Sequence, residues 1–331
     1  MKSREIRLAA RPVGLPQAAD FATAEIDLAP LADGEVLVRN HWMSVDPYMR
    51  GRMYDRVSYI PKFELGQPLQ GHAVGEVIES RAAGFVAGDL VSSMLGWREG
   101  FVSPASALEK LPGHDVPPQA YLGAMGMPGL TAYAGLLELG QPKAGETVFV
   151  SGGAGAVGSL VAQIAKLKGC TVVASAGGAE KCAWLRSIGV DHAVDYKAGD
   201  LLANVRAAVP KGVDVYFDNV GGEHLEVALD VARPFARFVE CGMIAIYNDA
   251  APAPGPRNLT MIIGKQLTIR GFVVFSFQHL KAQFEAEMAG WLGSGKIKVE
   301  ETVMTGIDRA PAAFMALFAG GNTGKMLVKL T

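Results

Sequence analysis

The chain has 331 residues, of which 50% are apolar and 19% carry a charge. This length is sufficient for two domains with large cores, and the composition argues against disorder. A net charge of −2 argues against nucleic acids or anionic membranes as partners, and three cysteines are too few for a disulfide framework. The N-terminus lacks the apolar core of a signal peptide, so we expect a protein of the reducing cytoplasm without a membrane segment.

The first 120 or so residues are β-rich. Short runs of strand character occupy 34–45, 72–80 and 87–95, and Gly, Pro and Asp residues separate them. There is little helical periodicity between these runs. The segment therefore predicts a partly open barrel or a folded sheet.

From about residue 121, strands and helices alternate, beginning with a helix predicted over Gly129 to Leu139. Further helices are predicted at 160–168, 180–188, 200–210, 223–233, 280–292 and 311–318. Strands are predicted at 147–151, 171–175, 192–196, 213–220, 235–244, 267–275, 296–303 and 325–330. Strands separated by helices of about ten residues indicate right-handed βαβ units and one parallel sheet, which is an α/β fold.

A glycine motif stands between the strand at 147–151 and the helix that follows it. Gly153, Gly155 and Gly158 have the G-x-G-x-x-G spacing of a dinucleotide-binding turn. Its first glycine permits the turn, its second lets the backbone approach a pyrophosphate, and its third brings helix and strand together. A flexible loop is the alternative, because 40 glycines make chance matches common. The strand–helix alternation after the motif favours the dinucleotide-binding turn.

The chain resembles the medium-chain dehydrogenase/reductase superfamily. Within it, the closer resemblance is to the zinc-independent group of leukotriene B4 dehydrogenases, prostaglandin reductases and NADP-dependent alkenal double-bond reductases. The matching segments are SVDPYMRGRM (44–53), GMPGLTAYAGLLELG (126–140), VFVSGGAGAVGSLVAQIAKLKGC (148–170), VYFDNVGGE (215–223), CGMIAIYN (241–248) and PAAFMALFAGGNTGK (311–325).

This resemblance implies two domains. One is a Rossmann-type doubly wound parallel sheet at 122–293, which binds the dinucleotide. The other is a β-rich, GroES-like partial barrel with the catalytic role, formed by 1–121 together with 294–331.

The cofactor is predicted to be NADP(H). An NAD enzyme needs an acid about 20 residues after the first glycine, and nothing acidic occurs between Thr171 and Ala179. Lys181 could supply the cation for a 2′-phosphate, and the alternative is a solvated lysine in the first turn of a helix. A lysine in that turn is unfavourable to the helix dipole, which slightly favours the functional interpretation. The resemblance places Lys181 and Tyr196 at the 2′-phosphate. It also assigns to the cofactor the motif glycines and Ala156, Val157, Thr131, Asn219, Phe272, Val274 and Asn322.

No metal site is expected. Zinc-dependent relatives use a cysteine with a His-Glu pair at the catalytic ion and four cysteines at a structural ion, but this chain has no cysteine before Cys170. His72 stands where the zinc histidine would fall, with Ala73 in place of the glutamate. A histidine without partner ligands is more often a structural residue.

A metal-free site favours reduction of a C=C bond conjugated to a carbonyl. The charge that develops there delocalises onto the carbonyl oxygen, and one or two hydrogen-bond donors can stabilise it. The resemblance identifies Tyr247 as the catalytic donor and as a substrate contact, together with Tyr48. A phenol with an ordinary pKa of about 10 stays protonated at neutral pH. From the residues alone, a loop tyrosine that only packs is as good an interpretation of Tyr247.

The substrate is therefore expected to be a small α,β-unsaturated aldehyde or ketone. An NADPH:quinone oxidoreductase is the alternative enzyme, and a non-catalytic NADPH-binding protein is the alternative of another class. The Pro-rich segment Asp249 to Asn258 is long for an α/β connection and is predicted to be a mobile lid. A homodimer is expected by family analogy alone.

Overall fold

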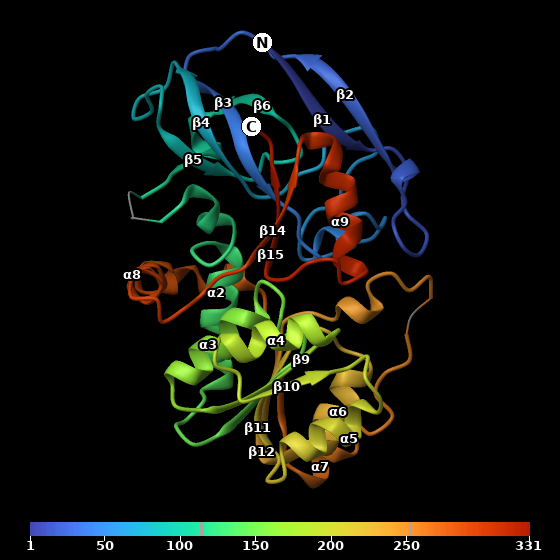
Figure 1. Cartoon of the computed structure of the whole chain (residues 1–331). Coiled ribbons are helices and arrows are strands. Elements are labelled where there is room, and N and C mark those ends of the chain that lie inside the picture. Colours follow the sequence, from blue (N-terminus) through green and yellow to red (C-terminus); the bar gives the residue numbers. More distant parts are fainter. Residues whose placement is uncertain (113–115, 252) are drawn as a thin grey trace. The chain divides into compact units, whose positions relative to one another are not determined.

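The computed structural model describes residues 1–112, 116–251 and 253–331. These residues form two compact units (Figure 1). The terminal unit contains Met1–Leu122, Glu301–Asn322 and Met326–Thr331, and the central unit contains Gly123–Glu300 and Thr323–Lys325. The sequence-based division placed its boundaries after residues 121 and 293. The central unit instead continues to Glu300 and takes up three further residues near the C-terminus.

The terminal unit is built on a seven-stranded sheet with the order β14-β15-β3-β4-β5-β7, and β6 pairs with β3 outside this path. The strands are β3 (Glu35–Ser44), β4 (Ala73–Ser80), β5 (Leu90–Ser93), β6 (Gly100–Pro104), β7 (Glu109–Lys110), β14 (Glu301–Thr305) and β15 (Lys325–Lys329). The two C-terminal strands thus lie in the same sheet as the N-terminal ones. The predicted strand at 296–303 is displaced to Glu301–Thr305.

A separate antiparallel pair, which the sequence analysis missed, is formed by β1 (Lys2–Leu8) and β2 (Phe21–Asp27). It packs with helix α9 (Ala310–Phe318), as Figure 1 shows. Ile6, Leu8 and Phe314 are fully buried in one cluster with Trp97. Burial of these large side chains joins the two ends of the chain in one core. The short helix α1 (Met49–Arg52) contributes Met49 to the same cluster.

The central unit contains a six-stranded parallel sheet with the order β10-β9-β8-β11-β12-β13. The strands are β8 (Thr147–Val150), β9 (Thr171–Ala176), β10 (His192–Asp195), β11 (Val213–Asp218), β12 (Ala232–Glu240) and β13 (Thr268–Gly271). Counted along the chain this order is 3-2-1-4-5-6, which is that of a Rossmann fold. The predicted fold class, a doubly wound parallel sheet beside a β-rich domain, is confirmed.

Helices cover both faces of this sheet. Helices α2 (Met127–Ala134) and α3 (Gly158–Leu167) pack together, and α5 (Leu201–Ala208) packs with α6 (Glu223–Val231) on the other face (Figure 1). The unit also contains α4 (Ala179–Ser187), α7 (Met261–Gly264) and α8 (Lys281–Gly293). The predicted cap of α5 is confirmed, because Asp200 accepts a hydrogen bond from the Ala203 amide at 2.8 Å.

Four predicted elements differ in their boundaries from the structure. Helix α6 ends at Val231 rather than at Arg233, because Pro234 disfavours helical geometry at the residue before it. Strand β12 consequently begins at Ala232 and ends at Glu240, four residues before the predicted end. The helix predicted to continue to Leu139 changes to a π-helix over Gly135–Gly140. Strand β13 stops at Gly271, where 267–275 was predicted.

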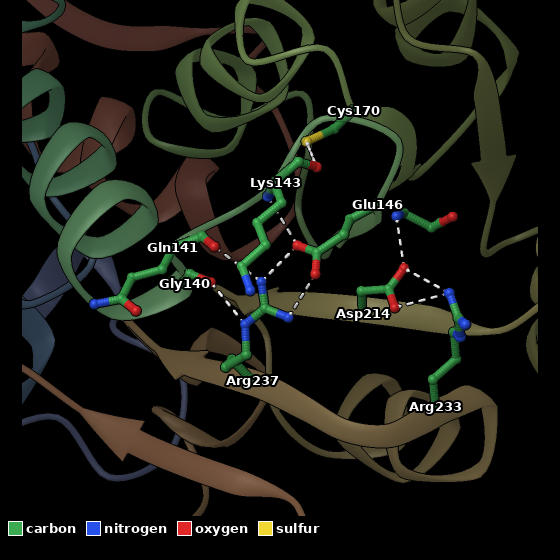
Figure 2. Close-up of polar contacts among 9 residues, drawn as sticks. Gly140, Gln141, Lys143, Glu146, Cys170, Asp214, Arg233 and Arg237 are labelled. Atoms are coloured by element: carbon green, nitrogen blue, oxygen red, sulfur yellow. Dashed lines mark hydrogen bonds and ion pairs between the residues drawn. The ribbon is translucent and has the colours of Figure 1, made fainter.

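A half-buried ion pair joins the residue before β8, Glu146, to Arg237 within β12 (Figure 2). Arg237 donates two hydrogen bonds to Glu146, at 3.0 and 2.5 Å, and further ones to the carbonyls of Gly140 and Gln141. Glu146 also accepts from the Lys143 amide. This network fixes the start of β8 and thereby the strand that leads into the glycine turn.

Among the described residues, no helix combines the length and the apolar character that crossing a membrane requires.

Candidate active site

The glycine turn connects β8 to α3 at the carboxyl end of the central strand of the sheet. Its left-handed residue is Gly152, with φ +59°, one residue before the predicted motif. A side chain on Gly153 would come within 2.7 Å of the Cβ of Ala174, and one on Gly158 within 2.4 Å of the Gly152 carbonyl oxygen. At Gly155 the nearest such atom is 3.3 Å away. The turn is therefore tightly packed at Gly153 and Gly158 and less crowded at Gly155, the glycine that in this motif lets a pyrophosphate approach the backbone.

Helix α3 begins at Gly158, with Ala156 and Val157 in the turn before it. The first amides of a helix lack partners within the helix, and the helix dipole attracts negative charge to this end. The motif residues thus surround a helix N-terminus of the kind that holds a pyrophosphate.

A second segment closes on this turn. The Gly324 amide donates to the Ala154 carbonyl at 2.7 Å, and Gly155 and Gly324 form an isolated bridge. Gly324 has φ +65°, and a side chain on it would collide with the Glu300 carbonyl. Sequence reasoning did not single out Gly324, although it lies in the matching segment at 311–325.

Asn219 is held rigidly at the end of β11. Its backbone amide donates to Ser151 Oγ and its side-chain amide to the Ser151 carbonyl, both at 2.8 Å. Ser151 Oγ in turn donates to Asp218 Oδ1 at 2.7 Å. The same Asp218 oxygen accepts from the amides of Val220 and Gly221. The predicted cofactor residue Asn219 is therefore fixed next to the last residue before the glycine turn.

Tyr247 lies seven residues beyond the end of β12, after the 3₁₀ turn Ile244–Ile246. This segment is bonded to the turn after β11, because Cys241 and Gly242 donate to the Asp218 carbonyl and Ile244 donates to the Asn219 carbonyl. The Tyr247 hydroxyl accepts from the Met243 amide at 3.2 Å. An accepted hydrogen bond uses an oxygen lone pair, so the phenol keeps its proton for donation.

Lys181 and Tyr196 converge on the turn after β9. A side chain on Gly177 would come within 2.7 Å of the Tyr196 hydroxyl and 2.9 Å of Lys197 Cε. Burial, and then the charge of Lys197, lower the pKa of Lys181. Two lysines and a phenol thus gather where the second strand of a Rossmann fold meets the adenine ribose. Sequence reasoning missed Lys197, whose signal was its position directly after Tyr196.

The other predicted cofactor residues of the central unit lie around helix α2. Thr131 Oγ1 donates back to the Met127 carbonyl at 2.7 Å. The Phe272 ring contacts Phe217 edge to face, and Val274 is buried at the start of a 3₁₀ segment. A side chain on Gly135 would lie 2.7 Å from the Phe272 ring, which explains a glycine in this helix.

Two predicted residues, Tyr48 and Asn322, belong to the terminal unit. Tyr48 precedes α1, and burial, followed by the charge of Asp46, raises the pKa of its phenol above the ordinary range. Asn322 follows α9, immediately before the segment 323–325 that belongs to the central unit.

Among the described residues, no group of three His, Cys, Asp or Glu side chains could hold a metal ion. His114 lies outside these residues, and Pro252 of the predicted lid does too. The lid's far end is attached to α6, since Asn258 donates to the Glu226 carbonyl and to Asp230.

A glycine turn at the carboxyl end of β8, with Asn219 beside it and two lysines at the end of β9, defines a dinucleotide-binding Rossmann domain. Comparison with known proteins agrees. A family model described as the N-terminal domain of oxidoreductase matches residues 4–111, and one described as zinc-binding dehydrogenase matches residues 156–292.

Similar proteins cover the chain almost completely. Prostaglandin reductase 1 of Bos taurus is 42% identical over 96% of both chains. The NADP(+)-dependent 2-alkenal reductase of Nicotiana tabacum is 40% identical over 100% of this chain and 98% of its own. The structure of CurA from Vibrio vulnificus in complex with NADPH is 39% identical over 99% of both chains, with a TM-score of 0.95.

The chain therefore belongs to the medium-chain dehydrogenase/reductase family, in its zinc-independent group of prostaglandin and 2-alkenal reductases.

Proposed function

We propose that this protein is an NADPH-dependent reductase of the C=C bond of α,β-unsaturated aldehydes and ketones. The observation that carries the proposal is the bonding of the Tyr247 segment to the turn that holds Asn219, beside the glycine turn. It brings a hydroxyl donor into the same loop cluster as the cofactor-binding backbone. Membership of the family supports the same assignment.

The residues of the central unit fit NADPH. Gly153, Gly155, Ala156, Val157 and Gly158 form the turn and helix end for the pyrophosphate. Lys181, Tyr196 and Lys197 offer two cations and a hydroxyl to the 2′-phosphate. Asn219, Phe272, Val274 and Asn322 are further proposed contacts of the cofactor, and Thr131 is the one proposed to lie near the nicotinamide.

The chemistry needs one donor at the substrate oxygen. When bound, NADPH supplies a hydride to the β-carbon of the conjugated double bond. Tyr247 donates to the carbonyl oxygen, where the enolate charge develops, and water provides the proton for the α-carbon. Because the donor interacts with charge that is absent from the ground state, it stabilises the transition state selectively.

The terminal unit is proposed to be the GroES-like catalytic domain, with Tyr48 in contact with the substrate. The buried Tyr48 phenol keeps its proton over a wide pH range, because its pKa is raised. The proposed mechanism uses no zinc, which agrees with the absence of any cysteine before Cys170 and with Ala73 in place of a glutamate after His72.

An assay of purified protein with NADPH and a panel of enals, enones and quinones tests the proposal. We expect consumption of NADPH with enals and enones, and a product in which the C=C bond is reduced and the carbonyl is kept. Turnover of quinones alone would establish the quinone oxidoreductase instead. NADPH binding without turnover of any compound would identify a non-catalytic NADPH-binding protein.

We further propose a homodimer in the cytoplasm. Strand β13 is an edge strand whose four residues are all exposed, and its outer edge is available for pairing. Exposed apolar side chains gather near it, with Ile263 81% and Phe235 64% exposed. A second copy of this chain, related by a two-fold axis, would cover both the edge and these side chains.

A further inference from the structure

A pair of buried carboxyl groups lies directly beneath the candidate site. Asp218 and Glu240 are register partners at the ends of the neighbouring parallel strands β11 and β12. Asp218 Oδ2 and both carboxyl oxygens of Glu240 are inaccessible to solvent, and none of them accepts a hydrogen bond from the backbone or from a charged side chain of the described residues. Buried acceptor oxygens that receive no hydrogen bond cost free energy. The pair therefore requires a proton on one of its two carboxyl groups, which a carboxyl group of ordinary pKa would lose at neutral pH.

One proton shared by the pair resolves this problem. Two carboxyl groups in contact inside a protein do not both ionise readily. Asp218 already accepts three hydrogen bonds through Oδ1, so the proton belongs on Glu240. Burial, and then the charge of Asp218 and the hydrogen bond to it, raise the pKa of Glu240 to about 8. At neutral pH Glu240 is thus a hydrogen-bond donor.

Asp218 is the common anchor of the two loops of the site. Its side chain holds Ser151 and the amides of Val220 and Gly221, which shape the turn that carries Asn219. Its backbone carbonyl accepts from the amides of Cys241 and Gly242, which begin the segment that carries Tyr247. A displacement of Asp218 therefore reaches both residues.

We propose that Glu240 is a positioning residue, whose protonated carboxyl group donates to Asp218 and thereby fixes the loops that carry Asn219 and Tyr247. The inference rests on the proposed function, which places Asn219 at the cofactor and Tyr247 at the substrate. It also predicts that the loops loosen when Glu240 loses its proton.

Among the described residues no cation faces the pair, and the Tyr216 hydroxyl is a neutral donor close to Asp218. Tyr216 of β11, Cys241 after β12 and His224 of α6 face the pair, and the partner of Glu240 on β13 is Gly271, which has no side chain. Burial keeps His224 neutral, because it lowers the pKa of this imidazole. The influences on Glu240 among the described residues are burial and Asp218, without a cation. Ionisation of Glu240 therefore leaves two like charges in contact.

The test compares wild type with Glu240→Gln, Glu240→Met and a control, Glu138→Gln, in which an exposed carboxylate is removed. NADPH affinity is measured by fluorescence titration, and hydrogen exchange of the peptide 218–224 is measured without cofactor, both between about pH 7 and about pH 9.5. Glutamine keeps the shape of Glu240 and a donor at every pH, whereas methionine removes the donor at every pH.

Between about pH 7 and about pH 9.5 we expect the Kd for NADPH to rise in wild type and in the control. This rise should exceed the rise in Glu240→Gln by roughly three- to tenfold. Protection of 218–224 should fall in parallel. Any change in the charge of Lys181 is common to all variants, so the difference from Glu240→Gln isolates Glu240. Glu240→Met should bind NADPH as weakly at pH 7 as wild type does at high pH.

Equal pH profiles of wild type and Glu240→Gln, in both affinity and hydrogen exchange, would overturn the inference. So would a Glu240→Met variant with wild-type affinity and protection at pH 7. If none of the variants bound NADPH, the proposed function would fail, while hydrogen exchange of 218–224 would still decide whether Glu240 holds the turn.

Discussion

Arg237 and Glu146 form a two-pronged ion pair across the sheet, with donor–acceptor distances of 3.0 and 2.5 Å and side chains that are 22% and 20% exposed (Figure 2). Arg237 also satisfies two carbonyls at the end of the π-helix, those of Gly140 and Gln141. One side chain thus connects β12, the segment before β8 and the helix that leads into the central unit.

Arg237→Met should destabilise the central unit, because it leaves a half-buried carboxylate and two carbonyls without their donor. We expect a loss of about 1.5–3 kcal/mol in the free energy of unfolding. This corresponds to a fall of roughly 4–10 °C in Tm. Arg233→Met is the matched control, since Arg233 is half exposed where it pairs with Asp214, and it should cost less than about 1 kcal/mol. Similar losses in both variants would contradict the special role of Arg237.

The same pair gives a pH dependence of stability. Although burial alone would raise it, the hydrogen bonds from Arg237 and the Lys143 amide hold the pKa of Glu146 below its ordinary value. A lowered folded-state pKa contributes stability that is present above the unfolded-state pKa of about 4.5 and lost as the pH falls through the folded one. Chemical denaturation should therefore show that the difference in free energy of unfolding between wild type and Arg237→Met becomes smaller below about pH 4. A difference that stays the same at every pH would contradict the stabilising role of ionised Glu146.

The sequence was sufficient to predict those elements whose signals lie within a few neighbouring residues. The glycine turn, the Asp200 cap and most strands of the parallel sheet follow from periodicity and turn residues within a few positions. Strand β12 was predicted less well, because it contains a bulge against β11 and a left-handed residue, Phe235. Neither is encoded by alternation of apolar residues.

Long-range relationships could not be predicted. The contact of Gly324 with the glycine turn joins positions about 170 residues apart, and the carboxyl pair Asp218–Glu240 exists only because β11 and β12 are neighbours in register. In the sequence, Glu240 is one acid at the end of an apolar run. Its environment is decided by strand order, which is a property of the whole sheet.

Lys181→Ala should impair use of NADPH selectively. A charge-assisted contact to phosphate is worth about 1.5–3 kcal/mol, so the KM for NADPH should rise by roughly ten- to a hundredfold, while that for NADH stays nearly unchanged. Lys168→Ala, at an exposed lysine after α3, is the control. Steady-state kinetics with both cofactors provide the measurement, and equal losses with NADPH and NADH would remove Lys181 from the 2′-phosphate site.

Active protein should contain no stoichiometric zinc. The described residues offer no group of three ligands, and the chain has no cysteine before Cys170. We expect elemental analysis of active protein to find well under one metal per chain, and chelators to leave the rate unchanged. Loss of activity on chelation, with recovery on addition of zinc, would establish a metal enzyme.

Ile263→Glu should convert the proposed dimer into a monomer. It places a charge among exposed apolar side chains next to the edge strand β13, where burial against a second copy would leave it unpaired. Val86→Glu, at a similarly exposed apolar residue of the terminal unit, should have no effect. Sedimentation at micromolar concentration provides the measurement. A monomeric wild type, or an Ile263 variant that remains a dimer, would rule out this surface.

Tyr247→Phe should slow the chemical step and spare cofactor binding. The change keeps the ring and removes the hydroxyl, which accepts from Met243 and is proposed to donate to the enolate oxygen. Loss of a main oxyanion donor costs roughly 10²–10³ in kcat. We expect about a tenfold loss, equivalent to about 1.4 kcal/mol, because the ribose hydroxyl of the cofactor can share the role.

Tyr121→Phe is a matched control, since it also removes a hydroxyl that makes a hydrogen bond, in this case to the Pro112 carbonyl at 2.8 Å in the terminal unit. It should leave kcat unchanged. A larger change at position 247, Tyr247→Ala, separates packing from catalysis, because loss of the ring also disturbs the turn at Met243. If Tyr247→Phe reduced enones at the wild-type rate and Tyr247→Ala raised only KM, the tyrosine would serve packing, and the donor to the enolate would have to be sought elsewhere.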